Sequence, residues 1–245
     1  MKLVLIGNGN MGKAIMALLA ETKQHHVLAA LSSKDSLHSE MLAEADALID
    51  FTNAVAFLQN LPILLKSHKP IVVGTTGWYD ELDTVRKKVE AAQGALLYAA
   101  NFSLGVNLFL RLAKVAASLI APFPEFDVAI TEVHHTRKKD APSGTALKAA
   151  EHILSALPRK RTWRTALLHE APLQKDELLI SSLRLGSVFG QHTICIDSPA
   201  DELTIMHSAK NRRGFAEGAV QAAEWLQGKQ GMFSFDDFLA EKLGL

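Results

Sequence analysis

The sequence lacks the features that would mark a secreted, membrane-bound or nucleic-acid-binding protein. Among its 245 residues there is a single cysteine, Cys195, so the chain can form no internal disulfide and no thiolate zinc cluster. Basic and acidic side chains number 26 each, and this balance gives no overall field to attract nucleic acid or a membrane. No apolar run approaches the ~18 residues that a membrane-spanning helix needs, and Met1 leads into an apolar strand without a basic leader. We expect a cytoplasmic protein with no nucleic-acid or membrane partner.

The chain does have a glycine-rich turn near its beginning. The apolar residues 2–6 run into a G-x-G-x-x-G sequence made of Gly7, Asn8, Gly9, Asn10, Met11 and Gly12. Such glycines permit a tight turn, close approach of a pyrophosphate and close packing of the next helix. An amphipathic stretch from Met11 to about Thr22 and an apolar strand at 27–31 follow in the expected order. We predict that this turn binds a dinucleotide.

The residues after that second strand bear on the choice of dinucleotide. An NAD-preferring protein usually places Asp or Glu there, whereas this chain has Ser32, Ser33 and Lys34. Hydroxyls and an ammonium suit a 2′-phosphate, which supplies charge and acceptors for them. Asp35 lies one residue further on and could still reach a ribose. The sequence therefore predicts use of NADPH, NADH or both, with NADPH preferred.

Two parts of the chain differ in their expected secondary structure. Up to about residue 100, further strands at 47–51, 70–74 and 95–99 alternate with helices at 54–67 and 79–92. Beyond a helix at about 105–121, strands dominate, at 126–133, 177–185, 191–197 and 202–209, interrupted by a helix after Gly144. The first pattern is typical of a doubly wound parallel sheet and the second of a mixed sheet.

We therefore predict an α/β protein: a Rossmann-like doubly wound parallel sheet with a second α+β domain built on a mixed open sheet. The dinucleotide-binding domain is expected at 1–104 plus 214–245, because a helix at about 213–226 can return to cover it. Residues 105–213 are expected to form a substrate-binding and oligomerisation domain.

Two loops at predicted strand ends of the first domain are further cofactor candidates, since ligands of doubly wound folds bind there. Their residues are Gly74, Thr75 and Thr76 in one, and Ala99, Ala100, Asn101 and Phe102 in the other. Small residues and hydroxyls would let a nicotinamide ring lie close to the backbone. Without the glycine-rich turn and the histidine loop, an ordinary turn for the first and a domain hinge for the second would be equally good interpretations.

The densest chemistry lies in residues 132–146, EVHHTRKKDAPSGTA. His134 and His135 end a predicted strand, and Arg137, Lys138 and Lys139 follow in a loop. Ser143 then precedes Gly144 and Thr145 at a helix start, where free backbone N–H groups would bind an anion. Taken singly, the histidines could be one packed and one solvated, the cations a solvated run, and Ser143 only a helix cap. Together they suit a dicarboxylate substrate.

The same stretch resembles the signature of the dihydrodipicolinate reductase family, also called 4-hydroxy-tetrahydrodipicolinate reductase. Segments 74–77, 99–107, 184–192 and 207–220 also resemble the family, in the expected order. The resemblance covers essentially the whole chain. It implies an NAD(P)H-dependent oxidoreductase that reduces a small cyclic dicarboxylate with loss of water, in the diaminopimelate route of lysine biosynthesis. It implies a homotetramer as well.

The resemblance also implies roles for single residues. His134 matches the proton donor and Lys138 the second catalytic position, while His135, Gly144 and Thr145 match substrate-binding positions, to which we add Ser143. Hydride delivery to a conjugated ring carbon builds negative charge, which an imidazolium or a nearby ammonium can neutralise. No metal is expected. The chain departs from the family at the cofactor end, where its glycine loop is compact and Ser32, Ser33 and Lys34 replace an acidic residue followed by Arg.

Three rival interpretations remain open from the sequence. An imine or amino-acid dehydrogenase could use the same cofactor turn with a different small acid. A regulatory protein could bind NADPH without turnover. A metal-dependent hydrolase could use His134, His135 and Asp140, although adjacent strand residues rarely chelate one ion together.

Overall fold

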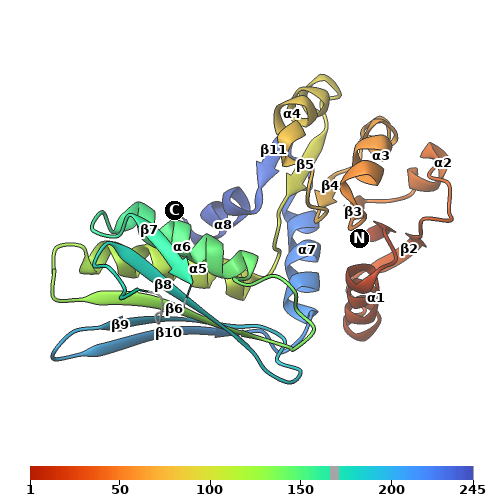
Figure 1. Ribbon diagram of the computed structural model, residues 1–245. Coiled ribbons are helices and arrows are strands. Elements are labelled where there is room, and N and C mark those ends of the chain that lie inside the picture. Colours follow the sequence, from red (N-terminus) through yellow and green to blue (C-terminus); the bar gives the residue numbers. More distant parts are fainter. Residues whose placement is uncertain (166–170, 245) are drawn as a thin grey trace. The chain divides into compact units, whose positions relative to one another are not determined.

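The structure is a computed structural model that describes residues 1–165 and 171–244 (Figure 1). It divides into two compact units, Met1–Ser103 with Arg212–Leu245, and Leu104–Asn211. The chain therefore passes between the units at residues 103–104 and again at 211–212. Among the residues described, no helix has the length and apolarity needed to cross a membrane.

The first unit is built on a six-stranded sheet in which every pairing is parallel. Its strands, in the order β11-β5-β4-β3-β1-β2, are Gly231–Ser234, Ala95–Tyr98, Ile71–Val73, Ala47–Asp50, Lys2–Ile6 and His26–Leu31. The central strands β1, β3 and β4 are almost wholly buried, which explains their unbroken apolar composition. The order reverses direction at β1, so the carboxyl ends of β1 and β3 form the position where doubly wound sheets bind ligands.

Helices cover this sheet and complete its core. They are α1 (Asn10–Thr22), α2 (Ser39–Leu42), α3 (Ala54–Lys66), α4 (Leu82–Ala91), α7 (Arg213–Trp225) and α8 (Phe235–Leu243), with a short 3₁₀ turn at Tyr79–Glu81. Helix α1 packs on α7, and α2 on α3. Phe57, Leu61 and Trp78 are among the fully buried side chains of the core beneath them.

The second unit is a five-stranded mixed sheet with two helices on one face. Its strands, in the order β10-β9-β6-β8-β7, are Glu202–Ser208, Gln191–Asp197, Asp127–His134, Glu177–Arg184 and Thr162–Thr165. Strand β6 pairs parallel with β8 and antiparallel with β9. Helices α5 (Leu104–Ile120) and α6 (Gly144–Ala156) pack against each other and on the sheet (Figure 1).

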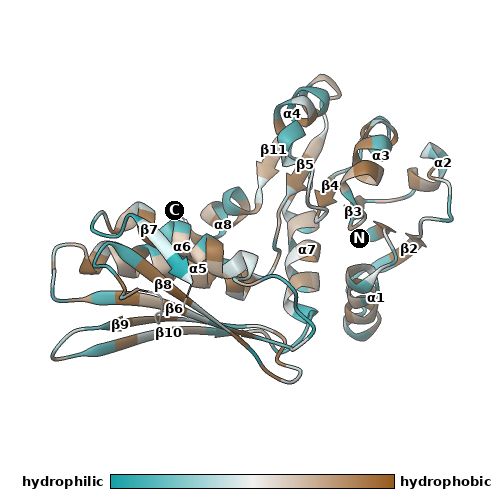
Figure 2. Cartoon of the chain, viewed as in Figure 1, coloured by the Kyte–Doolittle hydropathy of each residue, from teal (hydrophilic) through white to brown (hydrophobic). Residues whose placement is uncertain are grey.

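Side chains in this sheet alternate between a helix-covered face and an open face, as strand geometry requires. Figure 2 shows the alternation as apolar and polar bands along the strands. Val128, Ile130, Glu132 and His134 of β6 are buried on the helix-covered side, whereas the residues between them are only half-buried. An apolar core thus gives way to polar residues toward the end of β6, on the face that the helices cover.

The predicted fold class is confirmed: a parallel Rossmann-like sheet and a second, mixed sheet are both present. The sequence reading missed α2, β7, β11 and α8. Strands β7 and β11 have four residues each, too few for a periodic pattern to stand out. Helix α8 does carry a start signal, a capping box between Ser234 and Asp237, which could have revealed it.

Candidate active site

The glycine-rich turn has a geometry that only glycine can adopt at two of its positions. Gly7 has a φ of 102°, and a Cβ there would lie 2.3 Å from the carbonyl oxygen of Phe51. A Cβ on Gly12 would lie 2.3 Å from the Gly7 carbonyl oxygen. Next to Gly9, in contrast, nothing lies within 4 Å of the Cβ position. The turn is therefore closed on the side of the sheet and open where a phosphate would approach.

Helix α1 begins directly after this turn, with Gly9 as its N-cap. No side chain caps its first turn, and no acidic residue lies there. Its unpaired backbone N–H groups and the positive end of its dipole are thus available to an anion. This arrangement fits the pyrophosphate of a dinucleotide.

Phe51 joins the three predicted cofactor segments, although the sequence reading gave it no role. Besides closing on Gly7, its ring occupies the space that a side chain on Gly74 would need, 1.9 Å from that Cβ position. It also makes an edge contact with Phe102, at 5.9 Å between ring centroids. The place of Phe51, immediately after β3 at the edge where ligands bind, was the signal that could have found it.

Asp50 connects the loop after β3 with the loop after β4. Its buried carboxylate accepts hydrogen bonds from the Thr52 and Thr75 hydroxyls, both at 2.7 Å. Burial raises the pKa of Asp50, and the threonine bonds only partly offset this. The hydroxyl of Thr75 is therefore used inside the protein, while Thr76 is exposed. In the next loop, Phe102 is a buried core side chain, and the Asn101 side chain accepts from the backbone of Ser103 at 2.8 Å.

The loop after β2 is organised around Asp35. Its carboxylate accepts hydrogen bonds from the Ser32 backbone N–H and hydroxyl, both at 2.7 Å. These bonds hold the pKa of Asp35 below its usual range. A carboxylate therefore does lie at the end of β2, beside exposed Ser33 and Lys34.

In the second unit, polar side chains from neighbouring strands meet on the helix-covered face of the sheet. Cross-strand register pairs His134 with Arg184, Glu132 with His192, and His192 with His207. The shared register aims these side chains at one place, next to the start of α6.

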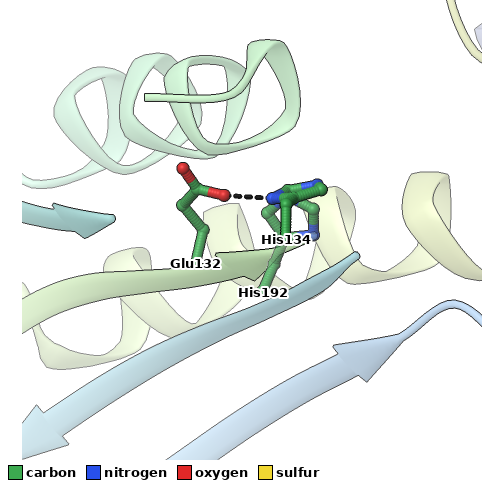
Figure 3. A group of neighbouring side chains, drawn as sticks. All are labelled: Glu132, His134 and His192. Carbon is green, nitrogen blue, oxygen red and sulfur yellow. Dashed lines mark hydrogen bonds and ion pairs between the residues drawn. The ribbon is translucent and has the colours of Figure 1, made fainter. Parts of the chain in front are cut away.

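Glu132 and His134 form a hydrogen-bonded pair at the centre of this group (Figure 3). The His134 Nδ1 atom bonds one Glu132 carboxylate oxygen, and Arg184 donates to the other at 3.0 Å. Burial would raise the pKa of Glu132, but hydrogen bonds from Arg184, Ser182 and His134 outweigh it and hold that pKa below its usual range. Glu132 is thus an anion with almost no exposed surface.

The other ring nitrogen of His134 faces a glycine. A Cβ on Gly190 would lie 2.9 Å from His134 Nε2, closer than real side chains approach. Burial lowers the pKa of His134, the Glu132 carboxylate opposes this, and the charges of Lys138 and Arg184 add to the lowering. Because Nδ1 is engaged by a carboxylate, Nε2 is the atom that can gain and release a proton.

His192 links this pair to the start of α6. Its Nε2 lies 2.9 Å from the Ser143 hydroxyl, and its ring centroid lies 5.1 Å from that of His134. Ser143 is the N-cap of α6 and accepts from the Ala146 N–H at 3.2 Å. Burial, with a further contribution from His134, lowers the pKa of His192 to about 4, so His192 is neutral at physiological pH.

The loop between β6 and α6, here called the basic loop, carries Arg137, Lys138 and Lys139. Its backbone is hydrogen-bonded to Arg184 of β8. Arg184 donates to the backbone carbonyls of Asp140, at 2.6 Å, and Lys138, at 3.4 Å. Lys138 Nζ contacts both carboxylate oxygens of Asp140, at 2.9 and 2.8 Å. Arg137 and Lys139 are exposed. The first turn of α6 carries no acidic side chain, and the space beside Gly144 is open.

Glu132, His134 and His192 also resemble a metal-ligand set, since one ligand atom of each lies within 4.8 Å of the others. However, Glu132 already bonds the Arg184 guanidinium and His134, and Lys138 adds a second fixed cation nearby. Positive charges next to the carboxylate oppose a divalent cation there. The group is better explained as a hydrogen-bonded acid–base cluster. It also differs from the trio of His134, His135 and Asp140 considered for a hydrolase.

The structure thus brings His134 and Ser143 together through His192, and holds Lys138 in the adjoining loop. His135 lies half-buried beyond the end of β6. Glu132, Arg184 and His192 received no role from the sequence reading. The spacing of Glu132 and His134, two residues apart on one strand, was a signal that they share a face.

Comparison with known proteins shows the family to which this chain is similar. The family described as "Dihydrodipicolinate reductase, N-terminus" matches residues 1–102, and "Dihydrodipicolinate reductase, C-terminus" matches residues 105–239. The 4-hydroxy-tetrahydrodipicolinate reductase of Christiangramia forsetii is 37% identical, with 98% of each chain covered. That of Syntrophus aciditrophicus is 33% identical, with 95% of this chain and 96% of the relative covered.

A solved structure is similar as well: a dipicolinate-bound dihydrodipicolinate reductase from Paenisporosarcina sp. TG-14. Its TM-score is 0.79 at 25% identity, and the match covers 96% of this chain and 97% of that one. Two family matches, two curated relatives and a solved fold thus agree over almost the whole length of the sequence. The chain belongs to the dihydrodipicolinate reductase family.

Proposed function

We propose that the helix-covered face of the mixed sheet carries out the reaction of this family, with His134 as the proton donor. The reaction is the NAD(P)H-dependent reduction of 4-hydroxy-tetrahydrodipicolinate to tetrahydrodipicolinate with loss of water, in the diaminopimelate route of lysine biosynthesis. One hydride and one proton are added to the ring system, and one water leaves. The observation that carries the proposal is a buried histidine whose Nδ1 is held by a carboxylate and whose Nε2 is left for proton transfer.

The residues of this chain supply the proton and hold the substrate, while the nicotinamide cofactor supplies the hydride when bound. Charge that builds on the ring as hydride arrives is neutralised by a proton from His134 Nε2. Lys138 is the second catalytic group and places an ammonium beside the developing charge. The α6 N-terminus at Gly144 and Thr145, with Ser143 and His135, holds a carboxylate through backbone N–H groups and polar side chains. Lys138 Nζ donates to Asp140 in this structure. To bind a substrate carboxylate, it must either contact both carboxylates at once or leave Asp140.

The role of His134 is tested by replacing it with glutamine, which keeps a polar side chain of similar size. We expect the His134→Gln variant to lose about a hundredfold or more in kcat, as for loss of a general acid, while NADPH affinity changes little. The measurements are steady-state turnover and cofactor binding by fluorescence. Full turnover in this variant would refute the assignment of His134 as the proton donor.

For the cofactor, we propose that both NADPH and NADH are used and that NADPH is preferred. The exposed Lys34 and the Ser33 hydroxyl favour a 2′-phosphate, whereas the Ser32 hydroxyl already donates to Asp35. The Asp35 carboxylate disfavours binding of the 2′-phosphate, because an anion fixed at the end of β2 repels a second anion. We therefore expect a modest preference, and a clear preference for NADH in Michaelis constants would contradict it.

A further inference from the structure

We propose that Glu132 is a positioning residue for the reaction: paired with Arg184, it fixes the ring of His134 so that the mobile proton is always on Nε2. The inference rests on the function proposed above. It concerns a side chain that acts through His134 rather than by touching substrate.

The contacts of Glu132 leave it little freedom. It is 1% exposed, lies on the same face of β6 as His134, and uses one oxygen for His134 Nδ1 and the other for Arg184. Arg184 in turn donates to the Leu183 carbonyl at 2.8 Å as well as to the basic loop. The carboxylate is therefore held from two sides, and His134 Nδ1 meets an acceptor whose position is set by the sheet.

This contact decides where the protons of His134 lie. A carboxylate with a lowered pKa is acceptor-only, so the nitrogen facing it must carry a hydrogen in both the neutral and the charged ring. The second proton of the imidazolium then lies on Nε2, which faces Gly190 rather than a side chain. A ring without this contact would populate both neutral tautomers and would be free to turn about its Cβ–Cγ bond, so that Nδ1 in place of Nε2 would face the substrate.

Other charged and titratable groups face His134 but do not replace Glu132. Arg184 from β8 and Lys138 from the basic loop are cations and disfavour the imidazolium. His192 from β9 is neutral and is bonded to Ser143. Glu132 is thus the acidic group within this cluster of described residues that stabilises the protonated ring.

Glu132→Gln tests the proposal because an amide has only one oxygen. If that oxygen accepts from Arg184, the amide NH₂ turns toward His134 Nδ1 and drives the neutral proton to Nε2. We expect kcat to fall about ten- to a hundredfold while the substrate KM changes little, because orientation rather than binding is lost. Glu132→Asp keeps the charge on a shorter side chain and should restore part of kcat. Asp127→Asn, at the far end of β6 beside Lys160, is the matched control and should match the wild type.

The direct readout is the ¹⁵N shift of the imidazole nitrogens in histidine-labelled protein, with His134 assigned by its absence in His134→Gln. The proposal expects a neutral ring protonated on Nδ1 in the wild type and in Asp127→Asn, and a shift toward Nε2 in Glu132→Gln. A wild-type ring protonated on Nε2, or unchanged kcat in Glu132→Gln, would overturn it. These results are separable from the proposed function, because the wild-type tautomer is measured without turnover and His134→Gln tests the donor itself.

Discussion

Among the single residues, the protonation state of the buried His134 decides whether the proposed proton transfer can occur. In the free protein, burial lowers the pKa of His134, and the cations Lys138 and Arg184 lower it further than the Glu132 bond can offset. A dicarboxylate beside the ring would favour the imidazolium and raise that pKa. Substrate binding and protonation of the donor are therefore coupled.

This coupling predicts two different pH profiles. A general acid works only when protonated, so activity falls as pH rises through its pKa. The fall in kcat/KM, which reports the free enzyme, should come below the ordinary histidine value of about 6.5. The fall in kcat, which reports the complex, should come at higher pH. Initial rates over pH 5 to 9 at limiting and saturating substrate measure both, and a kcat profile falling at lower pH than kcat/KM would contradict the coupling.

At the scale of elements, the site depends on register between strands β6, β8 and β9. Gly190 precedes β9 and gives His134 Nε2 its space, although its φ is not in the left-handed region. A Gly190→Ala chain can therefore keep its backbone, but the new methyl group would press on the ring. We expect kcat to fall about ten- to a hundredfold with little change in melting temperature, since small displacements of a reacting group are costly. An unchanged kcat would show that the space beside His134 Nε2 is not required for proton transfer.

The helices and strands could be predicted from the sequence better than the contacts between them. Apolar periodicity and the glycine turn predict the long elements, because each depends on residues near one another in the chain. The pairing of Glu132 with Arg184 could not be predicted, since it depends on β8 lying parallel beside β6, some fifty residues away. The contacts of Phe51 could not be predicted either, because they join the loops that follow β1, β4 and β5; only its place directly after β3 was a signal.

At the scale of the whole molecule, the open face of the mixed sheet bears on assembly, and we propose that it forms the contacts of a homotetramer. Leu183 and Met206, exposed by 54% and 60%, lie on the strands at positions that face away from α5 and α6. Apolar side chains gathered on an uncovered sheet face favour burial against another copy.

The two passages of the chain between units, at 103–104 and 211–212, are where we expect any hinge.

Assembly is tested by light scattering on the eluting protein. The wild type should have a native mass four times that of one chain, and Leu183→Glu should lower it by placing charges in the contact. Val115→Glu, a substitution of equal exposure on the outer side of α5, is the control and should leave the mass unchanged. A monomeric wild type, or equal effects of both variants, would contradict the assignment of this face.

Reduction of the cyclic dicarboxylate can be followed as loss of nicotinamide absorbance. The substrate is made in situ from pyruvate and aspartate semialdehyde by the preceding synthase, and NADPH and NADH are supplied in separate reactions. We expect rapid oxidation that depends on the synthase, with both cofactors consumed and NADPH favoured. If both cofactors bind but neither is consumed, the cluster around His134 does not perform this reaction, and the proposed function is contradicted.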